Sequence, residues 1–389
     1  VVFEMAGFRP DTILVTLRAP FVSFAGGILP SRSTTQSDPD VQASTGIAVG
    51  AGGITNAQAI RAGGTLSRTV TFQVTGAAGA VRFYDTTGVR STVATATFPV
   101  GAFSTPAFFA GGLRLDAVAP GVDTITVTLP GATTAPSGGV IQQTVVPGAV
   151  TLADTVVQVG AGLLTKNTIG LDGHSIGVGG TGHQGVTLTL RVLEPGIALL
   201  QADDSSIGRD SIVVTLPAGA ASVKYYVAGL EGVLNDTVQV VATAPGLHPD
   251  TLKVVVRKAG LELQPYEPGL PAIIAAGEGA RDIYASIGVP DAAGTTVVIP
   301  QMLRPGSGLS GVVTFTVDNP GVAVLVEQAG LPEPIKMRSI GSGTSNTPIR
   351  MISGGVGFQP LTAGQVLLSV ATPGVTTVAR GIRPITVTP

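Results

Sequence analysis

The feature that most constrains the fold of this chain is a segment of alternating residues that recurs at the spacing of whole domains. Each copy has a turn, usually Pro-Gly, followed by a strand-like run. The copies are VVFEMAGFRPDTILVTL at 1–17, LDAVAPGVDTITVTL at 115–129, VVATAPGLHPDTLKVVV at 240–256 and LLSVATPGVTTVARGI at 367–382. Their shared anchor position is occupied by Asp11, Asp123, Asp250 and Thr376. These anchors are about 110 to 130 residues apart, the size of one domain, so the repeat predicts tandem domains rather than a solenoid.

A second block lies upstream of each of the last three copies, as TVTFQV at 69–74, TLTLRV at 187–192 and VVTFTV at 312–317. Strict alternation of apolar and polar residues is the period of a strand with one buried face. We therefore expect Phe72, Leu188 or Leu190, and Phe315 to point inward from equivalent strands. Each block should then be a β-strand of one domain.

The turns of the last three copies contain a glycine directly after proline. These glycines are Gly121, Gly246 and Gly374. A type II turn needs a positive φ at this position, which glycine adopts without strain. We expect a positive φ at all three.

The repeat order predicts domains at 20–130, 131–257 and 258–389, preceded by a closing hairpin of another domain at 1–19. A hairpin alone is marginal in water, so we expect the chain to be part of something longer. The apolar alternation of Ile13, Val15 and Leu17 should pack onto the first domain. Strand addition to a neighbouring chain is the alternative.

Composition supports an all-β fold. The 54 glycines and 28 prolines are interleaved with Val-, Ile- and Thr-rich strands, and no long stretch keeps a helical period. Charged residues are only 12% of the chain, which favours surface hidden in contacts between domains or subunits. The net charge of −2 makes nucleic acid an improbable partner, and no apolar run is long enough for a membrane-spanning segment. With no cysteine, disulfides and thiolate chemistry are excluded.

The segment PAGAASVKYYVAGLEGVLNDTVQVVATAPGLHPDTLKVVV at 217–256 resembles the ending of bacterial immunoglobulin-like (Big-type) tandem repeat domains of large surface proteins. The turn and strand DNPGVAVL at 318–325 is similar to another recurrent part of such repeats. The cysteine pair and tryptophan of antibody domains are missing. The resemblance implies two-sheet immunoglobulin-like sandwiches, an extracellular or cell-surface location in bacteria, and no catalytic residues.

The glycine-rich segment 170–185 contains the candidate catalytic motifs. Gly173 to Gly177, centred on Ser175, satisfies the GxSxG pattern, and a GxGxxG match follows at Gly177, Gly179 and Gly182. Both motifs work only when a helix follows, and none is expected here. We expect a surface loop.

The same segment offers Asp172, His174 and His183 as zinc ligands, although nothing fixes their spacing. A solvated loop is the alternative. His248, which matches Arg9 of the first copy, should be a solvent position. Acidic residues near turns could hold Ca²⁺, but Asx turns explain them more simply; they are Asp38, Asp40, Asp203, Asp204, Asp291 and Asp318.

We therefore predict no catalytic, cofactor-binding or metal residues, and no cofactor. The expected function is that of a non-enzymatic segment or subunit of a surface filament, sheath or stalk, with neighbouring copies of the same chain as partners. An adhesin stalk or a carbohydrate-binding module array is the alternative. A cell-surface glycan would then need exposed aromatics, for which Phe83 with Tyr84, Phe108 with Phe109, and Tyr225 with Tyr226 are the candidates. Asn235 begins the one N-x-T sequon, on a predicted turn.

Overall fold

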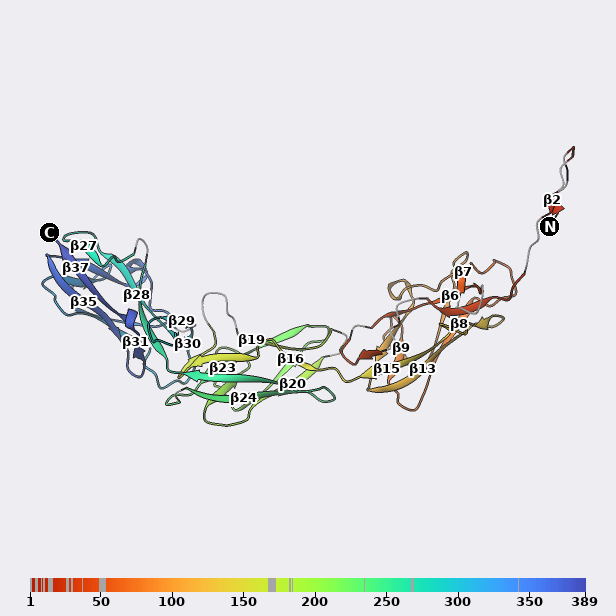
Figure 1. The fold of residues 1–389 in the computed structure, drawn as a ribbon, viewed down its shortest axis with the longest axis horizontal. Helices are drawn as coiled ribbons and strands as arrows, with labels where there is room; N and C mark the ends of the chain where they lie inside the picture. Colours follow the sequence, from red (N-terminus) through yellow and green to blue (C-terminus); the bar gives the residue numbers. More distant parts are fainter. Residues whose placement is uncertain are drawn as a thin grey trace. The chain divides into compact units, whose positions relative to one another are not determined.

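A computed structural model gives the fold (Figure 1). It describes residues 2–3, 6–7, 9, 11–12, 17–25, 28, 31–36, 38–48, 54–166, 173–181, 183, 185–233, 235–266, 269–341 and 343–389. Across these residues there are strands and three short 3-10 helices but no α-helix, which confirms the all-β prediction. The 3-10 helices are Phe108–Ala110, Met351–Ser353 and Ala379–Gly381. No helix in the described part is long and apolar enough to cross a membrane.

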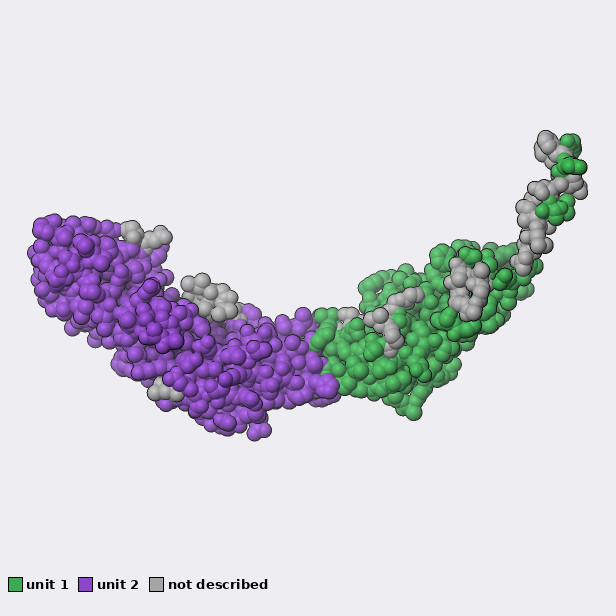
Figure 2. Space-filling view, in the orientation of Figure 1, with its two compact units in different colours: residues 1–148, 179–184 green, residues 149–178, 185–389 purple. Residues whose placement is uncertain are grey.

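The chain divides into two compact units, coloured in Figure 2. Unit 1 contains residues 1–148 with 179–184, and unit 2 contains residues 149–178 with 185–389. Unit 1 holds one β-sandwich and unit 2 holds two, each with its own buried apolar cluster.

The main sheet of the first sandwich has the order β11-β8-β13-β15-β4. Its strands are Val93–Thr97, Thr69–Thr75, Gly121–Thr128, Val140–Val146 and Ser31–Ser33. A second sheet has the order β10-β9-β12-β5, with strands Arg90–Ser91, Val81–Tyr84, Leu113–Ala117 and Asp40–Val41. A third has the order β14-β3-β6-β7, with strands Thr133–Thr134, Phe21–Phe24, Ala43–Ala48 and Ile54–Ala57.

The second sandwich begins with β16. Its main sheet, β17-β25-β24-β20-β22, is built from Val156–Gly160, Asp250–Arg257, Asp236–Thr243, Val186–Val192 and Ser211–Leu216. The opposite sheet, β16-β19-β23-β18-β30, is built from Val150–Leu152, His174–Val178, Ser222–Gly229, Leu163–Leu164 and Met302–Leu303. Strand β21, Ala198–Gln201, pairs with β23.

The third sandwich begins with β26. Its main sheet, β27-β37-β35-β31-β33, is built from Ile273–Ala275, Ile382–Thr388, Gly364–Ala371, Val312–Val317 and Ile335–Ser339. The opposite sheet, β32-β34-β28-β26-β36, is built from Ala323–Val326, Val356–Pro360, Arg281–Pro290, Gly260–Pro265 and Thr376–Thr377. Strand β29, Val297–Pro300, pairs with β28.

The predicted inward positions are buried. Phe72, Leu188, Leu190 and Phe315 each have no exposed surface, and they lie in β8, β20 and β31, three strands that occupy the same place in their sheets. The alternation therefore gave the correct face in all three domains, because only one parity of each strand can enter the core.

The repeat predicts a hairpin in each copy, but the copies at 115–129 and 367–382 are not hairpins. After Gly374 the chain enters β36, which pairs with β26 of the opposite sheet and not with β35. Strand β12 pairs with β9 and β5, whereas β13 pairs with β8 and β15 in the other sheet. The turn at Gly121 therefore crosses between sheets, unlike the turn at Gly246, which joins the paired strands β24 and β25. The φ angles are positive as predicted, at +151° for Gly121, +72° for Gly246 and +81° for Gly374. Gly121 at +151° does not have the conformation of a type II turn.

The strand pairing also places β15 in the first sandwich, so the boundary expected near residue 130 lies before the last strand of that sheet. At the N-terminus, β1 (Val2–Phe3) and β2 (Asp11–Thr12) form a two-stranded antiparallel sheet, as expected for a hairpin. Leu17 is 92% exposed, so the prediction that its side chain packs onto the first domain is wrong. Ile13 and Val15 lie outside the described residues, so their packing stays a prediction.

Candidate functional site

The candidate nucleophile Ser175 lies inside strand β19, not on a turn. It pairs with Lys224 of β23, which is a strand-to-strand contact and lacks the strand-to-helix bend that a nucleophile elbow requires. The neighbouring Gly177 has a packing role, since a Cβ there would lie 2.2 Å from the carbonyl oxygen of Ala221. Gly182 lies outside the described residues.

His174 makes one strong polar contact. Its Nδ1 lies 2.7 Å from Oδ2 of Asp154, while its Nε2 is buried without a hydrogen-bond partner. Its ring lies 5.7 Å from that of Tyr225. Asp172, the third residue of the predicted zinc set, falls outside the described residues, and His183 belongs to the segment grouped with unit 1. Within the described ranges, no three His, Asp or Glu side chains gather as metal ligands.

Two of the turn carboxylates, Asp203 and Asp291, accept hydrogen bonds within their own loops, as the Asx interpretation predicts. Asp203 accepts hydrogen bonds from Ser205 and Ser206, which hold the pKa of its carboxyl below the ordinary value. Asp291 accepts from the backbone N–H of Thr295 at 2.6 Å. Asp318 instead accepts from the backbone N–H of Leu367 in β35, a long-range contact that the Asx interpretation did not predict. The bonds of Asp203 and Asp291 organise their own loops.

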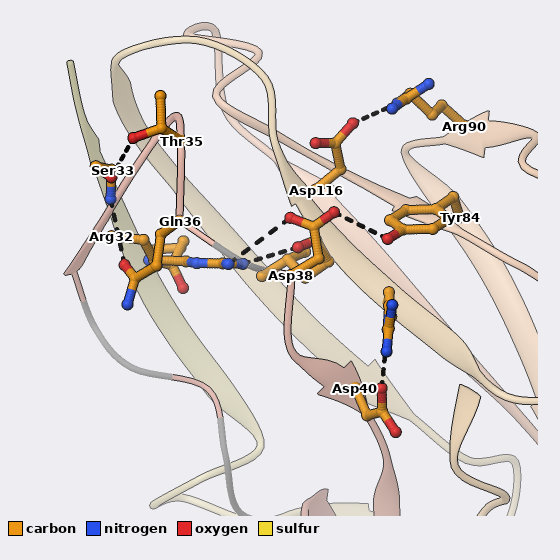
Figure 3. A network of polar contacts seen from close by, with 12 residues as sticks. Arg32, Ser33, Thr35, Gln36, Asp38, Asp40, Tyr84, Arg90 and Asp116 are labelled. Carbon is orange, nitrogen blue, oxygen red and sulfur yellow. Dashed lines mark hydrogen bonds and ion pairs between the residues drawn. The ribbon is translucent and has the colours of Figure 1, made fainter. Parts of the chain in front are cut away.

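Asp38 differs, because it belongs to a buried ionic network in the first sandwich (Figure 3). Arg32, on β4, is 4% exposed; its Nη1 donates to the carbonyl of Leu115 at 2.7 Å, and its Nη2 lies 3.7 Å from Asp38 Oδ1. The hydroxyl of Tyr84 donates to Asp38 Oδ2 at 2.9 Å. The prediction of a simple turn role for Asp38 was therefore wrong.

Burial sets the electrostatics of this network. Loss of hydration lowers the pKa of Arg32 and raises the pKa of Asp38, although the two charges oppose these shifts. Burial, together with the hydrogen bond to Asp38, raises the pKa of Tyr84 to about 12. The network is thus a buried set of paired charges, in which the attraction between Arg32 and Asp38 offsets part of the cost of their lost hydration.

Beside it, Asp40 positions an arginine against aromatic rings. Asp40 accepts from Nε of Arg114 at 3.1 Å and from the backbone N–H of Phe108. The Arg114 guanidinium lies 4.4 Å from the ring centre of Phe108 and 4.9 Å from that of Phe109. Phe109 is 85% exposed, and Tyr84 meets Phe108 edge to face at 5.5 Å. We call Tyr84, Phe108, Phe109 and Arg114 the aromatic patch.

The other aromatic pairs behave differently. Phe83 is buried and Tyr84 is partly exposed, as alternation in a strand predicts. Tyr225 and Tyr226 are both buried, which the sequence did not predict. Tyr226 packs with Leu164 and neighbouring apolar residues in a small cluster outside the main core.

Within unit 2, the second and third sandwiches share a strand contact that we call the junction. Leu163 and Leu164 of β18 pair with Leu303 and Met302 of β30, so a strand of the third sandwich's sequence completes a sheet of the second. Leu163 is fully buried and belongs to the apolar core of the third sandwich. Only Lys258 and Ala259 separate β25 from β26.

Buried polar side chains complete the junction. Gln301 is 2% exposed; it donates to the carbonyl of Gln158 and accepts from the backbone N–H of Gly160, both at 2.8 Å. Arg304 donates to both oxygens of Glu231, at 2.6 and 2.9 Å. Both bonds come from Nη2 of Arg304, and charge-assisted hydrogen bonds of this kind are stronger than neutral ones.

The contacts of Glu231 lower the pKa of its carboxyl. Burial opposes its ionisation, but hydrogen bonds from Ser307, Arg304 and the backbone N–H of Gly308 outweigh that effect and hold its pKa below the ordinary 4.5. The carboxylate is therefore charged at neutral pH. Sequence reasoning missed the junction because its partners are far apart in the chain and no motif connects them.

No protein-family model and no curated protein sequence matches this chain. Solved structures with similar folds include surface layer protein SbsC, domains 4–9, at 12% identity and TM-score 0.30, covering 94% of this chain and 47% of that one. The Escherichia coli adhesin FdeC is 12% identical, with TM-score 0.23 and coverage of 97% and 100%. The Yersinia pseudotuberculosis adhesin InvE is 11% identical, with TM-score 0.21 and coverage of 61% and 58%.

Proposed function

We propose that this chain is a non-enzymatic structural segment of a bacterial cell-surface protein, in which sandwiches are joined in series to make length. The junction carries this proposal. Two domains joined by a flexible linker move independently by default. Here the linker is two residues long, a strand is shared, and Leu163 of one sandwich lies in the core of the next.

A structural role predicts that the junction holds one geometry in solution. The chain has no cysteine, so two introduced cysteines can carry spin labels without background. Gln239 in β24 and Ala363, just before β35, are exposed and lie in different sandwiches of unit 2. Pulsed dipolar spectroscopy on the full chain labelled at Gln239→Cys and Ala363→Cys should give a narrow distance distribution.

Junction variants should broaden that distribution. Arg304→Ala removes the Glu231 contact, and Gln301→Ala removes both backbone hydrogen bonds. Arg281→Ala is the matched control, because it also breaks an Arg–Glu pair, with Glu278, but away from the junction. A broad distribution in the unmodified chain would contradict the proposal.

The aromatic patch supports a second candidate function, glycan binding by a surface protein. An exposed ring held beside an arginine and an aspartate offers both a stacking surface and hydrogen-bonding groups. Phe109 is the most exposed ring described, so Phe109→Ala should abolish any signal of the full chain on a glycan array. Phe103→Ala is the control, since Phe103 is also exposed, at 51%, and has no part in the patch. Equal loss in both variants would argue against the patch.

A further inference from the structure

The main sheet of the third sandwich has an uncharged outer face. On β27, β37, β35, β31 and β33, one parity of residues enters the core, and the other parity faces outward. Among the outward residues of these five fully described strands, none is charged. Six are exposed large hydrophobic residues: Ile273, Val312, Ile335, Met337, Leu367 and Ile382. We call this surface the third outer face.

The charged residues of these strands lie at the other parity. Lys336 is 6% exposed and pairs with Glu327 and Glu333. Arg338 pairs with Glu327, and Arg383 donates to the carbonyl of Leu270. These strands therefore contain cationic residues, but none of them lies on the third outer face. That face consists of apolar and uncharged polar side chains.

Such a surface is unusual for a protein that stays monomeric. Soluble sheets normally place lysine or other charges at exposed edges and faces, because an apolar, uncharged sheet invites association. Ile335 and Met337, at 48% and 59% exposure, lie on the edge strand β33, where such a charge would be expected.

The equivalent face of the second sandwich shows the contrast. Its outward residues include Arg191, Lys253 and Arg257. No acidic residue occupies an outward position of its five described strands. Two copies of that face would repel each other. The main sheet of the first sandwich, like that of the third, has no charge at its outward positions in the described strands, but threonine dominates there.

We infer that the third outer face packs against the same face of a second copy of this chain. This inference rests on the structural role proposed above and identifies its lateral partner. An uncharged face loses no ionic hydration when it meets its own copy, and every neighbouring copy supplies the same surface. Two-fold pairing of identical patches is the commonest symmetry of homo-oligomers.

The available area fits a weak pairing. Five strands about 4.8 Å apart and about six residues long, at about 3.3 Å per residue, give a face of about 500 Å². Two such faces bury about 1,000 Å² in total, the lower limit for a biological interface. A dissociation constant in the micromolar range or weaker is expected, which suits contacts repeated many times in a surface array.

Sedimentation velocity of the full chain over a wide concentration range tests the pairing. The unmodified chain should show a concentration-dependent monomer–dimer equilibrium. Met337→Lys would place like charges in the interface and should raise the dissociation constant at least tenfold. Val213→Lys is the matched control, because Val213 is 60% exposed on β22, the corresponding edge strand of the second sandwich. It should leave the dissociation constant unchanged.

Two further measurements make each outcome decisive. Circular dichroism melting checks that Met337→Lys is folded; if it is not, Ile382→Glu on the same face replaces it. The inference is overturned if the chain stays monomeric at all concentrations. It is also overturned if Met337→Lys and Val213→Lys change the dissociation constant equally. A dimer that dissociates only in Val122→Lys, a variant of the first sandwich, would overturn it as well. If Met337→Lys loses the dimer while the spin-label distance stays unchanged, the result supports pairing through the third outer face and is consistent with a stiff junction. A monomeric chain with a narrow distance distribution rejects the face alone.

Discussion

The sharpest test of the junction is Leu163→Ala, because this side chain belongs by sequence to the second sandwich but by packing to the third. Leu163 has no exposed surface and lies in the cluster that contains Phe315 and Leu325. The substitution removes three buried carbons. At about 0.8 kcal/mol for each, with a further contribution from the cavity, the expected loss is about 3 kcal/mol. That loss should fall on the third sandwich.

Native-state hydrogen exchange with mass spectrometry can assign the loss to a domain. Peptides from β31 and β35 should lose protection in Leu163→Ala, whereas peptides from β20 should keep theirs. Leu164→Ala is the control, since the adjacent leucine packs with Tyr226 and Ala228 in the second sandwich. A loss of protection confined to the second sandwich in both variants would refute the shared core.

Three further predictions concern the second and third sandwiches. Phe315→Ala should lower the free energy of unfolding of the third sandwich by about 3 to 5 kcal/mol in chemical denaturation, and an unchanged midpoint would show that the strand faces are misassigned. Because the folded-state pKa of Glu231 is lowered, its contribution to the stability of the junction is complete above pH 4.5 and is lost as the pH falls through the lower folded pKa. The spin-label distance distribution should therefore broaden in acid. Glu231→Gln should remove that pH dependence. Gly246→Val should destabilise the second sandwich by about 1 to 3 kcal/mol through backbone strain alone, since open space surrounds the position, and a thermal melt equal to that of the unmodified chain would exclude strain there.

The sequence predicted the parts of the fold that local pattern controls. Alternation identified the inward face of β8, β20 and β31, because a strand with one buried face leaves a two-residue period in the chain. The hairpin predicted at 115–129 was wrong. A hairpin and a crossing between two sheets can both have the pattern of a strand, a Pro-Gly turn and a second strand. What separates them is long-range pairing: Asp123 accepts from the backbone N–H groups of Ala80 and Val81, more than 40 residues away.

The candidate sites were less predictable, because each depends on distant residues. Arg32, Asp38 and Tyr84 meet only when three separate strands and loops assemble, and none of them stands in a motif. The junction is similar: Leu163 and Leu164 form a strand too short to show a period, and their partners in β30 lie far downstream. Composition alone hinted at hidden surface, through the small share of charged residues, but could not locate it.

The parallel pairing of the first and last strands in each main sheet has a mechanical consequence. Strand β4 pairs in parallel with β15, β17 with β25, and β27 with β37. Tension applied along the chain pulls such strands past each other, so their hydrogen bonds are loaded together in shear rather than opened one at a time. The β17–β25 ladder runs from Val156 to Gly160, whereas the β4–β15 and β27–β37 ladders cover only Ser31 to Ser33 and Ile273 to Ala275. Under load, the second sandwich should therefore be the last to yield.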